Sequence, residues 1–293
     1  MTSPNDNATE VIAGLGTIAD RYDVLLCDVW GVLHNGVAAF PEAGEALARF
    51  RARGGTVVLI TNAPRPHGVV RVMLDGLNAR SDAYDAIVTS GDVTRGEIAA
   101  RHGLPVWHLG PARDLPVFEG LDVSLAALED AAYVVCTGLF DDDTETPDDY
   151  ADRLRAMAER RLTMVCANPD LVVERGHELI YCAGAIAAAY EAIGGRSIYA
   201  GKPHLPIYAR AIERAVAVRG AAPDARRVLA IGDALRTDIA GARAAGFDSL
   251  FVARGIHAAE TLDDRGHIDE TRLSSLIAGR QPSPTVAIER LVW

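Results

Sequence analysis

Hydrophobic residues occur along this chain in short runs, and each run ends at a polar or glycine-containing turn. A run that is apolar along its whole length is typical of a strand covered on both faces, as in the parallel sheet of an α/β protein. Five runs therefore predict the strands of one sheet, at Val24–Cys27, Thr56–Ile60, Ile87–Val88, Ser197–Ala200 and Val228–Ile231.

Two segments between these runs have the periodicity of amphipathic helices. Residues 41–53 carry Ala43, Leu47 and Phe50 at helical spacing among charged residues, and residues 206–218 place apolar side chains on one side and charged ones opposite. Alternating strands and helices are typical of βαβ units. We therefore predict a Rossmann-like, doubly wound α/β core with a parallel sheet.

A stretch of about 90 residues interrupts this alternation. It contains the further apolar runs PVWHL, AAYVVC and LTMVC, and helical patterns at Tyr150–Arg161 and Ala185–Ile193. That is enough for a second α/β unit. We predict a core domain made of residues 1–103 and 195–293, with a smaller α/β domain, residues 104–194, inserted between its two parts.

Composition narrows the classes of function. The chain is 49% hydrophobic and 24% charged, which are globular proportions, and its 29 basic and 40 acidic residues give a net charge of −11. A negatively charged protein is repelled by nucleic acid and by an anionic membrane, so we expect neither as a partner. No apolar run approaches the ~18–20 residues of a membrane helix, and the first residues lack the basic and apolar regions of a signal peptide.

The cysteines are widely spaced and lie in apolar surroundings, at Cys27, Cys136, Cys166 and Cys182. They show no CxxC pair and no histidine at zinc-finger spacing. Cysteines of this kind usually act as small buried hydrophobic residues, so we predict free thiols and no metal site or disulfide. Reduced thiols favour a cytoplasmic location.

Residues that can carry chemistry follow several of the predicted strands, namely Asp28, Thr61-Asn62, Lys202, and Asp233 with Asp238. Open parallel sheets bind ligands beyond the carboxyl ends of their strands, so we expect these residues to converge on one cleft. Paired carboxylates repel unless a hard cation lies between them, and Mg²⁺ accepts carboxylate and substrate oxygens. A lysine adds a positive charge for an anion. One aspartate after a strand is more often a turn residue, but the whole set predicts a magnesium-assisted phosphoryl site.

Four segments occur in a characteristic order: DVWGVLHNG at 28–36, TN at 61–62, GKP at 201–203 and GDALRTD at 232–238. They resemble the four motifs of the haloacid dehalogenase (HAD) superfamily, specifically of subclass IIA, which contains NagD-like sugar-phosphate phosphatases and pyridoxal phosphate phosphatase. ANPD at 167–170, GAI at 184–186 and GARAAG at 241–246 add to the resemblance. It covers nearly the whole chain after about Tyr22. The insert would then be the mobile α/β cap domain of this subclass, which closes on the leaving group and excludes water.

The resemblance also implies a role for each residue of the set. Asp28 would be the nucleophile that accepts the phosphoryl group as an aspartyl-phosphate. Asp28, the main-chain carbonyl of Trp30 and Asp233 would hold Mg²⁺, while Asp238 would orient water or Lys202. The phosphoryl oxygens would be held by Thr61, the main-chain N–H of Asn62 and Lys202. The implied reaction is hydrolysis of a small phosphorylated metabolite such as a sugar phosphate.

Trp30 departs from the family pattern. Phosphatases of this family normally have a second aspartate there, which protonates the leaving oxygen and then deprotonates the attacking water. An indole has one N–H donor and no proton that titrates near neutrality. Three interpretations follow: a weak phosphatase that recruits another base, with His34 and His67 in suitable loops; a phosphotransferase with a long-lived phospho-enzyme; or a binding protein without turnover.

Three further residues are candidates for substrate binding. Arg65 follows the second motif, while Asp170 and Gly184 lie where cap loops set substrate choice in relatives; an exposed loop arginine and an ordinary turn before a helix explain them almost as well. The acidic run 141–149 lacks the alternating ligands and central glycine of an EF-hand loop. We interpret it as a solvated loop in which Thr146 or Pro147 opens a helix. Related caps often pair two subunits, so a homodimer through the cap is the assembly that the resemblance suggests.

Overall fold

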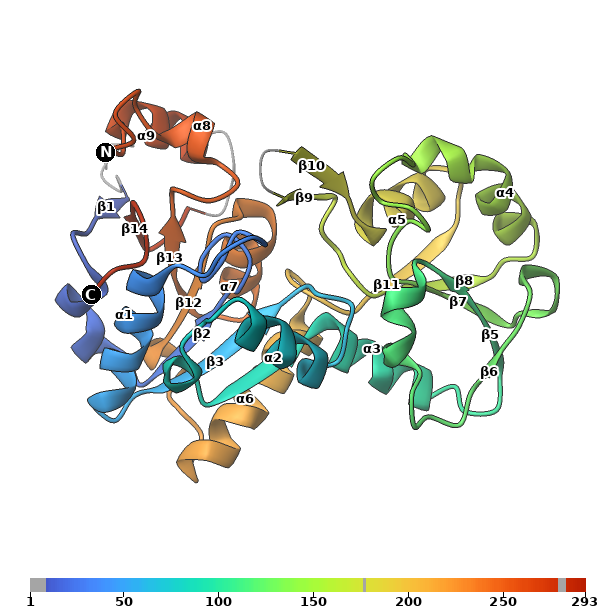
Figure 1. The fold of residues 1–293 in the computed structure, drawn as a ribbon, viewed down its shortest axis with the longest axis horizontal. Coiled ribbons are helices and arrows are strands. Elements are labelled where there is room, and N and C mark those ends of the chain that lie inside the picture. Colours follow the sequence, from blue (N-terminus) through green and yellow to red (C-terminus); the bar gives the residue numbers. More distant parts are fainter. Residues whose placement is uncertain (1–8, 176–177, 279–282) are drawn as a thin grey trace, which may run out of the picture. The chain divides into compact units, whose positions relative to one another are not determined.

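The computed structural model describes residues 9–175, 178–278 and 283–293. The chain forms two compact units, each built from separate stretches of sequence (Figure 1). The first unit comprises Met1–Ile60, Leu74–Ile87 and Ala211–Trp293, and the second comprises Thr61–Met73 and Val88–Arg210. Within the described residues, no helix combines the length and hydrophobicity needed to cross a membrane.

A seven-stranded sheet with the order β1-β14-β13-β12-β2-β3-β4 organises the first unit. Its strands are β1 (Glu10–Val11), β2 (Val24–Cys27), β3 (Thr56–Thr61), β4 (Ala86–Thr89), β12 (Val228–Gly232), β13 (Asp248–Val252) and β14 (Val286–Ile288). Strand β2 pairs in parallel with β12 on one side and with β3 on the other. Every residue of β2 is buried, which explains why this strand has no polar position.

Helices connect the strands of this sheet. They are α1 (Pro41–Ala52), α6 (Leu205–Arg219), α7 (Ala240–Ala244), α8 (Ala258–Thr261) and α9 (Glu270–Ala278), with the short helices η1 (Leu15–Thr17), η2 (Ala19–Arg21), η3 (Ser81–Ala83), η7 (Ala225–Arg227) and the π-helix η8 (Leu235–Ile239). Helix α1 begins at a proline, whose fixed φ suits the first helical position, and buries Ala43, Leu47 and Phe50 as its spacing predicts.

The second unit contains a five-stranded parallel sheet with the order β11-β8-β7-β5-β6 and a separate antiparallel hairpin, β9-β10. These strands are β5 (Pro105–Leu109), β6 (Ser124–Leu125), β7 (Tyr133–Cys136), β8 (Thr163–Cys166), β9 (Val172–Arg175), β10 (Glu178–Tyr181) and β11 (Arg196–Tyr199). Its helices are α2 (His67–Gly76), α3 (Ser90–Ala99), α4 (Ala151–Glu159), α5 (Ala183–Ala192), η4 (Ala112–Val117), η5 (Leu128–Asp130) and η6 (Pro147–Tyr150).

The core of this unit lies on both faces of its sheet. Along β7, Val134 and Cys136 join a cluster around Tyr150 and Tyr190, whereas Tyr133 and Val135 join a different cluster. This alternation is what a strand buried on both faces requires. All four cysteines are free and buried, as predicted.

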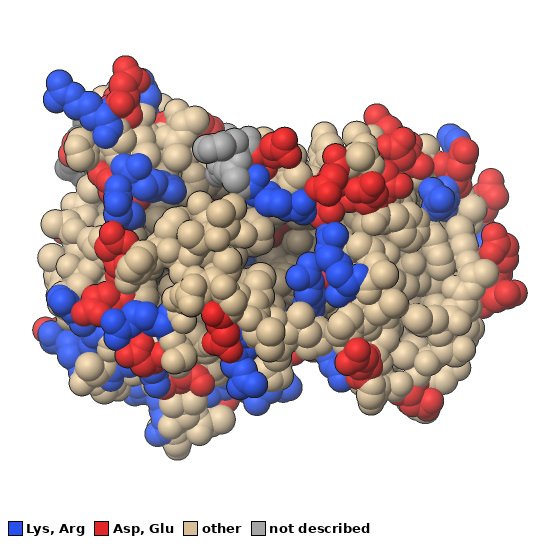
Figure 2. All heavy atoms as spheres, in the orientation of Figure 1, with Lys and Arg blue, Asp and Glu red and all other residues tan. Residues whose placement is uncertain are grey.

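The acidic run forms the predicted loop and helix start. Thr146 and Asp149 make a capping box at the beginning of η6, and α4 follows directly. Acidic side chains gather on the side of the second unit where Figure 1 places α4 and α5 (Figure 2). In the acidic run, Asp142 and Asp143 are paired with Arg175 at 2.8 and 2.7 Å, so part of the charge of this run is balanced locally.

One strand assignment is wrong. The pattern predicts the run Ser197–Ala200 in the core sheet, but β11 covers Arg196–Tyr199 and pairs with β8 at the edge of the five-stranded sheet. An apolar run carries no information about which of two sheets will pair with it, because pairing depends on distant residues. Lys202 therefore follows a strand of the second unit.

Candidate active site

The ends of β2 and β12 bring two carboxylates together. Cys27 is in register with Ile231, and the main-chain N–H of Asp28 donates to the Ile231 carbonyl at 2.8 Å. Asp28 and Asp233 each follow their strand by one residue and are 6% exposed. The carboxyl ends of two central parallel strands therefore place both side chains at the same edge of the sheet.

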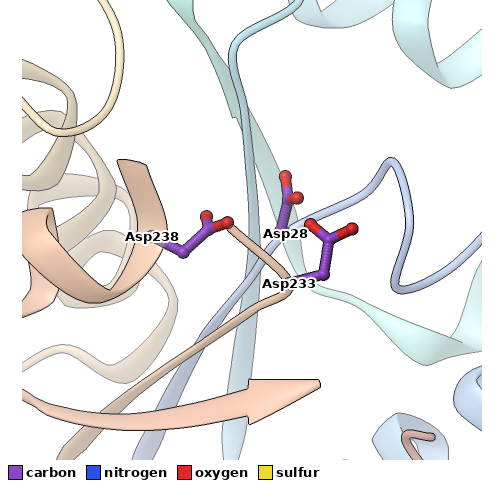
Figure 3. A group of neighbouring side chains, drawn as sticks. All are labelled: Asp28, Asp233 and Asp238. Carbon is purple, nitrogen blue, oxygen red and sulfur yellow. The ribbon is translucent and has the colours of Figure 1, made fainter. Parts of the chain in front are cut away.

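Asp238 completes this cluster from the π-helix η8, which follows β12. One carboxylate oxygen from each of Asp28, Asp233 and Asp238 lies within 4.8 Å of the other two, and all three residues are buried (Figure 3). Three carboxylates at this separation repel each other unless a cation or protons compensate them. Buried carboxylate oxygens are the donors that Mg²⁺ prefers, so these residues fit that ion.

Main-chain N–H groups hold two of the carboxylates in place. Ile256 donates to Oδ2 of Asp233 at 2.8 Å, and Ala234 donates to Oδ2 of Asp238 at 3.1 Å. These hydrogen bonds to charged acceptors anchor one oxygen of each of the two carboxylates.

Glycine is required where the chain passes closest to Asp233. A Cβ on Gly31 would lie 2.1 Å from Oδ2 of Asp233, and Gly31 has φ +82°, a conformation that favours glycine. A Cβ on Gly255 would lie 2.0 Å from the same oxygen. Gly255 and Ile256 could not be predicted from the sequence, because no motif marks them and only the folded chain brings them to the site.

Trp30 is partly buried and contacts the loop that follows β2. Its ring meets His34 edge-on, with centroids 5.1 Å apart and planes at 67°, and a Cβ on Gly36 would lie 2.7 Å from the indole. His34 is fully buried; its Nδ1 accepts from the Gly36 N–H at 2.8 Å, while Nε2 has no hydrogen-bond partner among the described residues. Burial lowers the pKa of His34 to about 4. His67, by contrast, is exposed and pairs with Asp92 at 2.9 Å.

The second unit holds the predicted phosphate-binding residues. Thr61 ends β3, and Asn62 follows it; the Asn62 side chain accepts from the Lys202 N–H at 2.7 Å and donates to the Lys202 carbonyl at 3.1 Å. Asn62 also donates to Oδ1 of Asp170 at 2.9 Å. Asn62 and Lys202 are buried, at 3% and 2% exposure. Residues from three distant parts of the sequence thus form one hydrogen-bonded group.

Arg65 and Gly184 also lie in this unit. Arg65 donates through Nε to Oδ1 of Asp114 at 2.7 Å, and the Asp114 side chain is only 3% exposed. A Cβ on Gly184 would lie 2.3 Å from the carbonyl oxygen of Pro169, so α5 begins in tight contact with the loop after β8. Asp114 could not be predicted as a partner of Arg65, because a single aspartate outside any motif carries no recognisable signal.

Known proteins with similar sequences belong to one superfamily. Residues 25–124 match the family of haloacid dehalogenase-like hydrolases, and residues 199–276 match a family described as HAD-hydrolase-like. Ribonucleotide monophosphatase NagD of Escherichia coli (strain K12) is 25% identical over 259 residues, which is 82% of this chain and 90% of that protein. D-glycerol 3-phosphate phosphatase of Mycobacterium tuberculosis is 33% identical over 256 residues, which is 83% of this chain and 66% of that protein.

Solved structures agree with this result. A hydrolase of the haloacid dehalogenase-like family from Brucella suis 1330 is 44% identical with a TM-score of 0.86, and the match covers 96% of this chain and all (100%) of that one. NagD from E. coli K-12 has the same fold, with 22% identity, a TM-score of 0.65 and coverage of 92% and 96%. The similarity to NagD over 82% of this chain agrees with the NagD-like subclass IIA, and since a 44% identical relative is matched over its whole length, this chain belongs to the haloacid dehalogenase superfamily.

Proposed function

We propose that this protein is a magnesium-dependent phosphatase that acts on a small phosphorylated metabolite, such as a sugar phosphate, through an aspartyl-phosphate on Asp28. The observation that carries the proposal is the buried cluster of Asp28, Asp233 and Asp238 at the ends of two central strands. Relatives named as phosphatases of ribonucleotides and of D-glycerol 3-phosphate support this class of reaction.

In the proposed reaction an Oδ atom of Asp28 attacks phosphorus, the ester P–O bond breaks, and the leaving group departs with the bonding electrons. Water then cleaves the acyl phosphate, which releases inorganic phosphate and restores the carboxylate. Mg²⁺, held by Asp28, the Trp30 carbonyl and Asp233, would offset the negative charge that brings phosphate and carboxylate together. Asp238 would hold this arrangement in position.

Thr61, the Asn62 N–H and Lys202 would bind the phosphoryl oxygens, as the resemblance implies. We assign Arg65 and Gly184 to binding of the leaving group of the substrate. We assign residues 104–194 to the cap domain. For Arg65, the support is that buried Asp114 holds its guanidinium in a fixed orientation.

Trp30 favours a second candidate, a phosphotransferase or a protein that binds phospho-ligands without turnover. No carboxylate stands at position 30, and general acid–base catalysis is typically worth ~10²–10⁴-fold in rate. Formation of the phospho-enzyme from an aryl phosphate or an anhydride depends least on this group, because such leaving groups are stable as anions.

A burst experiment with an aryl phosphate tests these alternatives. Release of the aryl alcohol would be followed on the millisecond-to-minute scale with Mg²⁺, with EDTA, and in Asp28→Asn. We expect steady turnover with Mg²⁺, and a loss of at least ~10³-fold in Asp28→Asn, because the amide is a poor nucleophile.

The other outcomes are equally informative. A burst of one equivalent that then stops indicates a stable phospho-enzyme and favours transfer to an acceptor. No release at all, while vanadate still binds, contradicts the phosphatase and favours a binding protein.

A further inference from the structure

The Asn62 side chain connects three separate segments of the second unit. Its Oδ1 accepts from the main-chain N–H of Lys202 at 2.7 Å, and its Nδ2 donates both to the Lys202 carbonyl at 3.1 Å and to Oδ1 of Asp170 at 2.9 Å. One amide therefore holds both main-chain polar groups of Lys202. Because Asn62 and Lys202 are buried, water does not compete strongly for these bonds.

Asp170 favours the same orientation of the amide as the Lys202 main chain does. An ionised carboxylate only accepts hydrogen bonds, so it selects the NH₂ end of Asn62 and turns the oxygen toward the Lys202 N–H. In the opposite orientation, NH₂ would face N–H, and oxygen would face both the Lys202 carbonyl and the carboxylate. All three donor–acceptor pairs would become repulsive at once.

Neighbouring glycines keep this group compact. A Cβ on Gly201 would lie 2.3 Å from Oδ1 of Asn62, and one on Gly184 would lie 2.4 Å from the carbonyl oxygen of Asp170. The Asp170 N–H is in turn held by Oδ1 of Asn168 at 3.0 Å. The main chain on both sides of the Asn62 amide is therefore tightly placed.

We infer that Asp170 is a positioning residue, which fixes the main chain at Lys202 through the Asn62 amide and so sets the place of the lysine ammonium. This inference rests on the proposed role of Lys202 in holding the phosphoryl group. It gives Asp170 a role on the phosphoryl side of the reaction, in place of a contact with the leaving group. A shift of about 1 Å in such a group lowers activity by up to ~10²-fold.

Vanadate binding tests the inference without needing turnover. We expect Asp170→Ala to weaken vanadate binding and to lower kcat/KM by about 10- to 100-fold. Asp170→Asn still offers an oxygen to Asn62 and should recover most of the loss. In a Lys202→Ala background, removing Asp170 should change binding less than about twofold, because a residue that acts through Lys202 has nothing left to position.

Substrate comparison separates positioning from direct recognition. Two phosphate esters with different leaving groups should lose kcat/KM by the same factor in Asp170→Ala, since both carry the same phosphoryl group. Unequal factors would mean that Asp170 contacts the leaving group, and would overturn the inference.

Matched controls cover folding. Asp148 is an exposed carboxylate of the same unit, and Asp148→Ala should behave like the wild type. If Asp170→Ala does not fold, Asp170→Ser removes the contact and keeps a polar group there. Equal vanadate affinity in wild type and in folded Asp170→Ala or Asp170→Ser overturns the inference. Wild type that binds vanadate without hydrolysing any ester contradicts only the proposed function, and wild type that does not bind vanadate overturns both.

Discussion

Among single residues, Trp30 occupies the position where phosphatases of this family have the aspartate that acts as general acid and base. Its indole is in contact with His34 and leaves no room for a side chain at Gly36. The loop after Asp28 is thus built around the tryptophan. The indole has no proton that titrates near neutrality and cannot protonate a leaving group. Replacing Trp30 by aspartate therefore tests whether a general acid at this position is what the site lacks.

We expect Trp30→Asp to raise the rate of hydrolysis by about 10²-fold or more, most strongly for alkyl phosphates, whose leaving groups need a proton. Steady-state kcat values for an aryl and an alkyl phosphate would measure the effect. Trp30→Asn is the matched control, because it has the same size as the aspartate variant and no titrating proton. No increase in Trp30→Asp, with folding and Mg²⁺ binding retained, would contradict this account.

His34 makes stability depend on pH. Burial lowers its pKa to about 4 in the folded protein, whereas the ordinary value is 6.5. Between these values the unfolded chain binds a proton that the folded protein does not, so the free energy of unfolding falls as the pH falls from 6.5 to 4, by about 3 kcal/mol. Above pH 6.5 both states are neutral and this contribution is constant.

Urea unfolding at pH 7, 5.5 and 4.5 would measure this effect as the difference between wild type and His34→Asn. The asparagine keeps an acceptor for the Gly36 N–H and does not titrate, so contributions from other acidic groups cancel. A difference between the two proteins that stays constant over this pH range would show that the pKa of His34 is the same in the folded and unfolded states, and would contradict this prediction.

For single helices and strands, the local sequence predicted the element limits wherever an apolar run ended at a polar residue. Strands β2 and β5 have the predicted limits, and α1 begins at the predicted proline. Strands β13 and β14 were not predicted, and β11 was assigned to the wrong sheet, because these facts depend on pairing between distant segments.

In the candidate site, too, local features could be predicted and contacts between distant residues could not. Asp28, Asp233 and Asp238 could be predicted because each lies directly after a strand or within a motif. The Asn62–Asp170 contact joins residues 108 positions apart, and neither residue carries a sign of it in the sequence. Which residues lie at strand ends was therefore predictable, while the contacts among them were not.

Helix α3 offers a prediction about an element boundary. Thr89 and Asp92 form a capping box: the Thr89 Oγ1 accepts from the Asp92 N–H at 2.9 Å, and Asp92 accepts from the Thr89 N–H at 3.1 Å. We expect Thr89→Ala to lower the free energy of unfolding by about 1 kcal/mol, because the Asp92 N–H at the helix start loses the hydroxyl oxygen that caps it.

Thr89→Ser retains the hydroxyl and should keep most of this stability. Denaturant unfolding of both variants would measure it. Equal loss in the two would assign the effect to the missing methyl group of the buried threonine.

In the molecule as a whole, some strands that pair with each other are far apart in the sequence. Strand β2 lies between β3, which follows within about 30 residues, and β12, which follows only after about 200. The first unit therefore depends on residues from both sides of the second. The order of the motifs indicated this arrangement, but no composition change marks its limits, so the predicted limits 104 and 194 stay a prediction.

This placement of β12 has a consequence for synthesis on the ribosome. At about 5–20 residues per second, roughly 10–40 s separate the appearance of Asp28 from that of Asp233. Throughout that time one side of β2 has no partner from β12, and the three acidic side chains have not met. A nascent chain that stops before residue 228 therefore never confines these negative charges in one place. The three carboxylates therefore meet only after the whole of the second unit has been synthesised.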